Sequence, residues 1–209
     1  MAFITAESRS DIIALVVTML NRAPDNTLLD ELVTAYNGGS TMAEIADHIA
    51  ASDEFVAANA ASQTAEEYAA AALDRAFQGA TVAADLRTAA IDLAVTYLND
   101  GMTKAGLAIA INDFLSNPDV LVNADQADFA NIAQAFVNKN TVAEYYVLDA
   151  DLGDLTAAEL TAAIASVTDA AASVTTAKAA ADTTAAAEEV VPGQTFTLTT
   201  GVNKFTGGA

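Results

Sequence analysis

A helix-start signal that recurs along the chain is the feature that most constrains its fold. In this signal a Thr or Ser side chain accepts a hydrogen bond from the backbone N–H three residues later, and a Glu at that position accepts one in return. Full versions stand at Thr41–Glu44, Thr64–Glu67, Thr141–Glu144 and Thr156–Glu159, and weaker ones at Ser8–Asp11 and Asn123–Gln126. Apolar residues at helical spacing follow the signals, so the sequence predicts an all-α fold.

Glycine and proline residues mark where these helices should end, because both residues interrupt helices. They stand at Pro24, Gly38–Gly39, Gly79, Gly101 and Pro118. Between starts and stops, the sequence predicts helices over residues 8–22, 27–37, 41–50, 64–78, 83–99, 103–116, 125–138, 141–149 and 156–189. Beyond them, the alternating pattern of Thr195–Thr199 predicts a strand in a short β tail.

Two interpretations are open for the Ala/Thr-rich segment 156–189. Its biased composition is typical of disordered linkers. However, Leu160, Ile164, Val167 and later residues up to Ala181 recur in alternating four- and three-residue steps, with Lys178 as the one charged member. Because Ala also has the strongest helix preference, we expect one long helix over the whole segment.

Two stretches of the chain share one order of features, which indicates an internal repeat. In each, a helix ending near a Tyr leads into an Asn/Gly turn, a second helix and an acidic ending. The first stretch runs from Tyr36 to Phe55 and the second from Tyr97 to Val120. We therefore expect one helical domain over residues 1–190, made of related units at about 8–62 and 63–124 and a third part at 125–190.

The charge balance argues against several classes of partner. The chain has 28 acidic and 8 basic residues, and the basic ones form no cluster in the sequence. Nucleic-acid binding needs clustered cations that neutralise phosphates, so we expect no nucleic-acid partner. Docking to anionic lipid through a basic segment is disfavoured for the same reason. No stretch has the length and hydrophobicity of a transmembrane segment.

Few residues offer catalytic chemistry. There is no Cys, and the only histidine, His48, lies inside a predicted helix. A hydrolase built on clustered carboxylates, with Asp53 and Asp119 as its acids, is one alternative because paired carboxylates can act as acid and base. Neither a phosphate-binding glycine loop nor a serine-hydrolase or zinc-protease motif is present. We therefore expect a protein that is not an enzyme.

Three carboxylates, at Asp149, Asp151 and Asp154, follow a predicted helix within six residues. Ca²⁺ binds such hard oxygen ligands, and closely spaced Asp residues are one way to supply them. The EF-hand spacing is not met, because Gly153 is out of place and Leu160 stands where the bidentate Glu is required. A Ca²⁺ site and a plain acidic loop are both consistent with this pattern.

A second candidate site precedes these carboxylates. Amide and charged groups are supplied by Asn138, Lys139 and Asn140, and aromatic rings by Tyr145 and Tyr146. Together they could hydrogen-bond a sugar and pack against it. The alternative is that the tyrosines pack inside a helical core.

Three segments resemble, in the same order, bacterial surface-layer proteins and other type I-secreted RTX-like proteins. Met19-Leu-Asn-Arg-Ala-Pro-Asp25, followed by Ser52-Asp-Glu-Phe55, resembles a helical repeat near their N-termini. Phe136-Val-Asn-Lys-Asn-Thr-Val-Ala-Glu-Tyr-Tyr146 is similar to the segment before their Ala/Thr-rich helix. Phe196-Thr-Leu-Thr-Thr-Gly-Val-Asn-Lys-Phe-Thr-Gly-Gly208 is similar to the start of their calcium-binding RTX repeats.

The resemblance implies an N-terminal anchoring domain of a surface layer (S-layer) on a Gram-negative bacterium. Such a domain binds the O-antigen polysaccharide of lipopolysaccharide, and a β-rich domain after it self-associates into a Ca²⁺-dependent two-dimensional lattice. Type I secretion to the outer face of the outer membrane agrees with the lack of an N-terminal signal peptide. We expect residues 191–209 to begin that β-rich region, although Asn203 and Lys204 depart from its calcium-binding pattern.

The expected function is therefore to anchor a protein lattice to the cell surface by binding lipopolysaccharide O-antigen. The polysaccharide contacts would be Asn138, Lys139, Asn140, Tyr145 and Tyr146, and a Ca²⁺ ion within this chain would be held by Asp149, Asp151 and Asp154. The alternative is the N-terminal module of a type I-secreted RTX adhesin or exoenzyme whose activity lies downstream.

Overall fold

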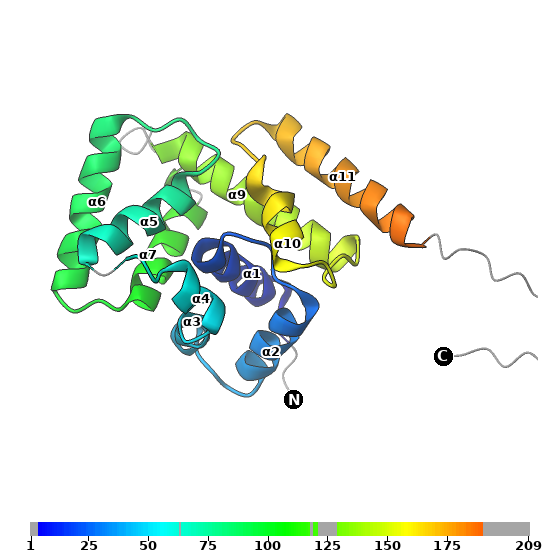
Figure 1. Cartoon of the computed structure of the whole chain (residues 1–209), viewed down its shortest axis with the longest axis horizontal. Helices are drawn as coiled ribbons and strands as arrows, with labels where there is room; N and C mark the ends of the chain where they lie inside the picture. Colours follow the sequence, from blue (N-terminus) through cyan, green and yellow to red (C-terminus); the bar gives the residue numbers. More distant parts are fainter. Residues whose placement is uncertain (1–3, 63, 118, 121–128, 190–209) are drawn as a thin grey trace, which may run out of the picture.

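The computed structural model describes residues 4–62, 64–117, 119–120 and 129–189. Within them the chain is helical and contains no strand (Figure 1), which confirms the predicted all-α class. The segment 191–209 with its predicted strand lies outside the described residues, as does the start signal at Asn123–Gln126. Among the described helices, none combines the length and the hydrophobicity needed to cross a membrane.

The described helices range from short turns to a five-turn rod. In chain order they are α1 (Ala6–Leu20), α2 (Asn26–Asn37), α3 (Met42–Ala50), α4 (Asp53–Ala58), α5 (Ala65–Phe77), α6 (Ala84–Asn99), α7 (Lys104–Ser116), α9 (Ala130–Glu144), the π-helix η2 (Tyr145–Asp149), α10 (Ala157–Ala165) and α11 (Ala171–Glu189). The sequence did not predict α4, which starts where Ser52 accepts a hydrogen bond from the Phe55 N–H.

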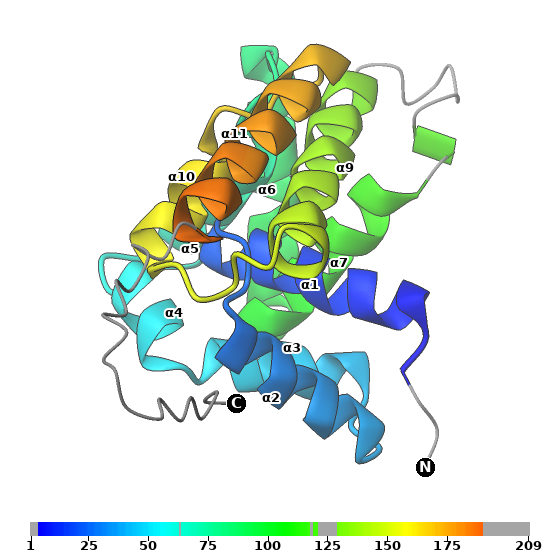
Figure 2. The same cartoon turned by 90° about the vertical axis from the view of Figure 1, so that its right-hand side faces the viewer.

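Helix α1 forms the centre of the molecule, with α3, α7 and α9 packed around it (Figure 2). The last nine residues of α1, from Ile12 to Leu20, are all buried. A helix with apolar residues around its whole circumference can be stable only when other elements cover every side. The run Ile12–Leu20, which is apolar except for Thr18, therefore accounts for the central place of α1.

Three of the four predicted capping boxes form, and the fourth does not. At Thr41, Thr64 and Thr156 the side chain accepts from the backbone N–H three residues on, and the Glu at that position accepts from the backbone N–H of the Thr. The box predicted at Thr141 is wrong, because α9 runs through this position without a break. The Thr141 hydroxyl instead donates to the Val137 carbonyl one turn earlier.

The single long helix predicted over 156–189 is also wrong, because the segment forms two helices, α10 and α11, separated by a turn. In this turn the Ser173 hydroxyl accepts from the Thr168 N–H at 3.0 Å. Asn138 of α9 donates to the Thr168 carbonyl at 2.7 Å. Ser and Thr side chains that bond to nearby backbone compete with helix formation. Here the buried side-chain amide of Asn138 also stabilises the turn.

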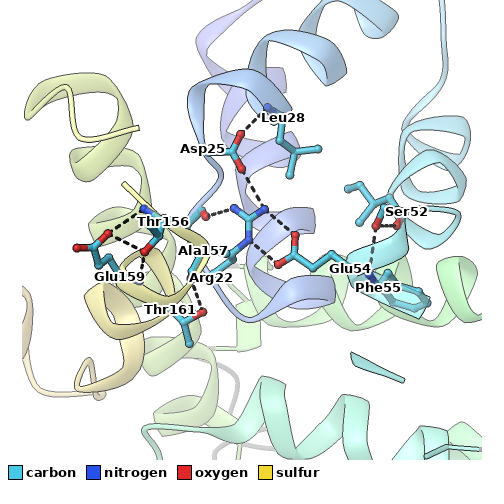
Figure 3. A network of polar contacts seen from close by, with 12 residues as sticks. Arg22, Asp25, Leu28, Ser52, Glu54, Phe55, Thr156, Ala157, Glu159 and Thr161 are labelled. Atoms are coloured by element: carbon cyan, nitrogen blue, oxygen red, sulfur yellow. Dashed lines mark hydrogen bonds and ion pairs between the residues drawn. The ribbon is translucent and has the colours of Figure 1, made fainter. Parts of the chain in front are cut away.

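A buried arginine, Arg22, joins the end of α1 to the start of α2 and to α4 (Figure 3). Arg22 is 3% exposed and donates from Nε and Nη2 to the two carboxylate oxygens of Glu54 at α4, each at 2.7 Å. Its Nη2 also pairs with Asp25, whose other oxygen caps α2. Burial opposes the charge, but Glu54 and Asp25 together outweigh it and raise the pKa of Arg22.

The second unit of the predicted repeat has its arginine in a different setting. Arg75, which lies within the second predicted unit, donates through both Nη atoms to Asn59 Oδ1 at 3.2 Å. Because a neutral amide takes the place of the carboxylate, burial lowers the pKa of Arg75. The two-unit repeat stays a prediction.

Candidate functional site

The end of α9 changes its helical winding just where the sequence places two tyrosines. The Ala150 N–H donates to the Tyr145 carbonyl at 2.9 Å, which closes a π-type turn over η2. Short π segments inside helices are often found at functional sites. This turn leaves Tyr145 half-buried at the surface and directs Tyr146, which is 6% exposed, toward the core.

Tyr145 contacts α11, which packs along α9 (Figure 2). The Tyr145 hydroxyl donates to Asp182 Oδ1 at 2.5 Å, and Lys178 Nζ lies 4.6 Å from the centre of the Tyr145 ring. The hydrogen bond to Asp182, some burial, and the charges of Asp182 and Asp149 raise the pKa of Tyr145. Its ring therefore lies beside one cation, its hydroxyl is bonded to the carboxylate of Asp182, and its pKa is also raised by the charge of Asp149. We call the group of Tyr145, Asp149, Lys178 and Asp182 the Tyr145 face.

Two of the predicted sugar contacts lie inside the protein and bond to residues between or just after other helices. Asn138, 7% exposed, donates to Thr168 and accepts from Gln134 Nε2 at 2.9 Å. Lys139, 2% exposed, donates to Gln78 Oε1 at 3.2 Å, just after α5. Burial lowers the pKa of Lys139 to about 8. Asn138 thus joins α9 to the turn between α10 and α11, and Lys139 joins α9 to the end of α5.

The other two predicted sugar contacts differ in exposure. Burial raises the pKa of Tyr146 and keeps its ring away from the surface. Asn140 is half-buried, and its Oδ1 has no hydrogen-bond partner within the described part of the chain. Of the five predicted contacts, only Asn140 and Tyr145 are thus partly open to solvent.

The three carboxylates of the predicted Ca²⁺ site are all exposed. Asp149 acts on Tyr145, whereas Asp154 accepts a hydrogen bond from Asn26 Nδ2 of α2 at 3.2 Å. Asp151 has a left-handed backbone, with φ of 54°. Across the ranges that the structure describes, no group of three or more His, Cys, Asp or Glu side chains has an arrangement that could hold a metal ion. Ca²⁺ binding stays a prediction.

The remaining titratable candidates have structural partners. His48 Nε2 lies 3.0 Å from Glu31 Oε1 in an exposed pair that joins α3 to α2. Asp53 is in the first turn of α4, where its charge favours the helix N-terminus. The Asp119 N–H donates to Asn117 Oδ1 within a local turn.

Sequence reasoning missed two members of the Tyr145 face, Lys178 and Asp182. A signal for them was present, because they are the only charged residues between Ala170 and Ala187 and stand four residues apart. Residues at that spacing share one face of a helix. The sequence does not show which element the Lys178 and Asp182 side of α11 packs against.

Comparisons with protein families, with curated proteins and with solved structures find no significant match to this chain.

Proposed function

We propose that this chain is a non-enzymatic helical module that anchors a surface-layer protein to the cell by binding the O-antigen polysaccharide of lipopolysaccharide. The order of the three family-like segments supports the proposal. So does the all-helical fold of the described residues, which agrees with the helical domain that the resemblance implies. On this proposal, secretion places the module on the outer face of the outer membrane, and a β-rich region after it forms the Ca²⁺-dependent lattice.

The observation that carries the site is the Tyr145 face. A sugar presents hydroxyls and C–H groups, so it is bound by aromatic rings together with strong hydrogen-bond acceptors and donors. Here a half-buried ring lies beside the ammonium of Lys178, its hydroxyl is bonded to the carboxylate of Asp182, and the charge of the exposed Asp149 acts on the same tyrosine. The site differs from the one predicted from the sequence, because Asn138, Lys139 and Tyr146 are buried.

Retention on immobilised lipopolysaccharide tests the proposal, with smooth lipopolysaccharide that carries O-antigen compared with rough lipopolysaccharide that lacks it. We expect retention on the smooth form only. Tyr145→Ala and Asp182→Ala should each weaken it at least about tenfold, which corresponds to the loss of about 1.4 kcal/mol of binding. Repeating the assay with Ca²⁺ and with a chelator shows whether the ion bridges sugar and protein.

Tyr97→Ala is the matched control, because Tyr97 is also an exposed tyrosine on a helix but lies on α6. It should bind as the wild type does. Absence of retention on smooth lipopolysaccharide with and without Ca²⁺ would contradict the proposal and favour the module of a secreted adhesin or exoenzyme. Equal loss in Tyr97→Ala and Tyr145→Ala would reject the Tyr145 face as the site.

A further inference from the structure

A second feature of the molecule lies away from the Tyr145 face, among α5, α6 and α7. An open cavity of about 300 Å³ is lined by side chains from all three of these helices, which also contact one another. Leu73, Phe77, Leu107, Ile111 and Leu115, all less than 8% exposed, contribute to its lining. Because this lining is buried, the cavity reaches into the core and is more than a shallow dip in the surface.

The walls and rim of this cavity are also apolar. Phe114 and Phe129 meet edge to face, with ring centres 5.1 Å apart, and both contribute to the lining. At the opening, Leu93 and Tyr97 of α6 remain 54% and 43% exposed. Helix α6 lies at the edge of the molecule (Figure 1), and Ala94 is its one buried residue. It thus presents apolar side chains to a space that no described side chain fills.

The electrostatics of the cavity restrict what it can hold. None of its lining residues is charged, and the Tyr97 hydroxyl is the one polar side-chain group among them. The nearby charges that link α5 to α6 are already paired, because Arg87 forms two 2.7 Å bonds with Asp74. The formal net charge of −20 disfavours an anionic guest still further. The matching guest is uncharged.

The size of the cavity indicates the class of guest. A closed apolar cavity of about 150 Å³ holds one benzene, and ligand pockets begin at about 300 Å³. We propose that this cavity binds the hydrocarbon chain of a neutral single-chain amphiphile, with the chain among the Phe and Leu side chains and the uncharged head near Tyr97. Such binding is separate from the proposed attachment to polysaccharide.

Fluorescence titration with Nile red, an uncharged dye, tests this site on the whole chain. We expect saturable binding of one dye per chain and displacement by n-decanol. Decanoate, which has the same chain and an anionic head, should displace the dye at least tenfold less well. Ala110→Phe, which places a ring in the cavity, should weaken dye binding at least tenfold, and Ala90→Leu should weaken it by a smaller factor.

Ala179→Phe, at an exposed position of α11, is the matched control and should leave dye binding unchanged. Circular dichroism shows whether each variant is folded, and Ala90→Leu replaces Ala110→Phe if the larger ring prevents folding. Absence of saturable dye binding, equal displacement by decanoate and decanol, or unchanged affinity in the folded cavity variants overturns the proposal. It is overturned equally if sedimentation shows that a second copy of the chain occupies this face and that the dye dissociates the dimer.

Discussion

Lys139 Nζ donates to Gln78 Oε1 across 3.2 Å in the interior, and this bond joins the middle of α9 to the end of α5. The lysine is 2% exposed and has a neutral partner in place of a carboxylate. Removing an ammonium from water without an opposite charge is costly, which is why burial lowers the pKa of Lys139 to about 8 from its usual 10.5.

The stability of the protein should therefore rise with pH above pH 8. Below this value Lys139 is charged in both the folded and the unfolded chain, and the cost of burial is fully present. Between pH 8 and 10.5 the folded chain has released the proton and the unfolded chain still holds it, so the free energy of unfolding increases. The full rise is about 3 kcal/mol, because one pKa unit corresponds to about 1.4 kcal/mol.

Urea denaturation between pH 8 and pH 10 measures this rise in wild type and in Lys139→Met. Higher pH is avoided, because burial raises the pKa of Tyr68 to about 12 and its effect has the opposite sign above pH 10. Lys139→Met should lack the rise and should be about 1–3 kcal/mol more stable than wild type at neutral pH. The same pH slope in both proteins would show that Lys139 is not the source.

Removal of the Glu54 carboxylate should destabilise the protein. Glu54→Ala leaves the buried Arg22 guanidinium with Asp25 as its one remaining carboxylate. Breaking a fully buried ion pair costs about 3–5 kcal/mol; the Glu54 side chain is 39% exposed, so we expect about 2 kcal/mol. Chemical denaturation measures the loss in the free energy of unfolding. The control is Asp53→Ala, a substitution at the exposed neighbouring residue. A similar small change in both variants would contradict a structural role for the pair.

Two threonines with the same sequence signal should respond differently to substitution. Thr156→Ala removes a formed capping box at α10 and should cost about 1 kcal/mol. Thr141→Ala acts inside α9, where no cap exists, and should change the stability by less than about 0.5 kcal/mol. Thermal unfolding of the two variants checks the contrast. A larger cost at Thr141 would mean that a helix does begin there.

Two glycines with positive φ provide a second matched pair. Gly39, with φ of 106°, has open space around its Cα, so Gly39→Ala should cost only the backbone strain, about 1 kcal/mol. At Gly79, with φ of 93°, an added Cβ would meet the Val167 carbonyl at the turn between α10 and α11. Gly79→Ala should cost at least about 2 kcal/mol more, because that turn must shift. If both variants lose the same stability in denaturation experiments, Gly79 does not lie against the turn between α10 and α11.

The Tyr145 face could be predicted only in part from the sequence. The sequence predicts Tyr145 as a sugar contact and Asp149 as a Ca²⁺ ligand, so it assigns the two residues to different sites. Asn138, Lys139 and Tyr146 belong to the same stretch, yet they are buried. Sequence spacing gives the side of a helix on which a residue lies, but not whether another helix covers that side. Lys178 and Asp182 join the face because α11 packs against α9.

What the sequence determined by itself is local. The caps at Thr41, Thr64 and Thr156 each involve residues only three positions apart, and the apolar run Ile12–Leu20 required a fully covered helix. The tertiary structure decided the cases in which local preferences compete. Helix α9 continues through Thr141. The chain leaves the helical path between α10 and α11, where the buried amide of Asn138 donates to the Thr168 carbonyl. A hydrogen bond between residues 30 positions apart depends on how the whole chain packs, and no local pattern encodes it.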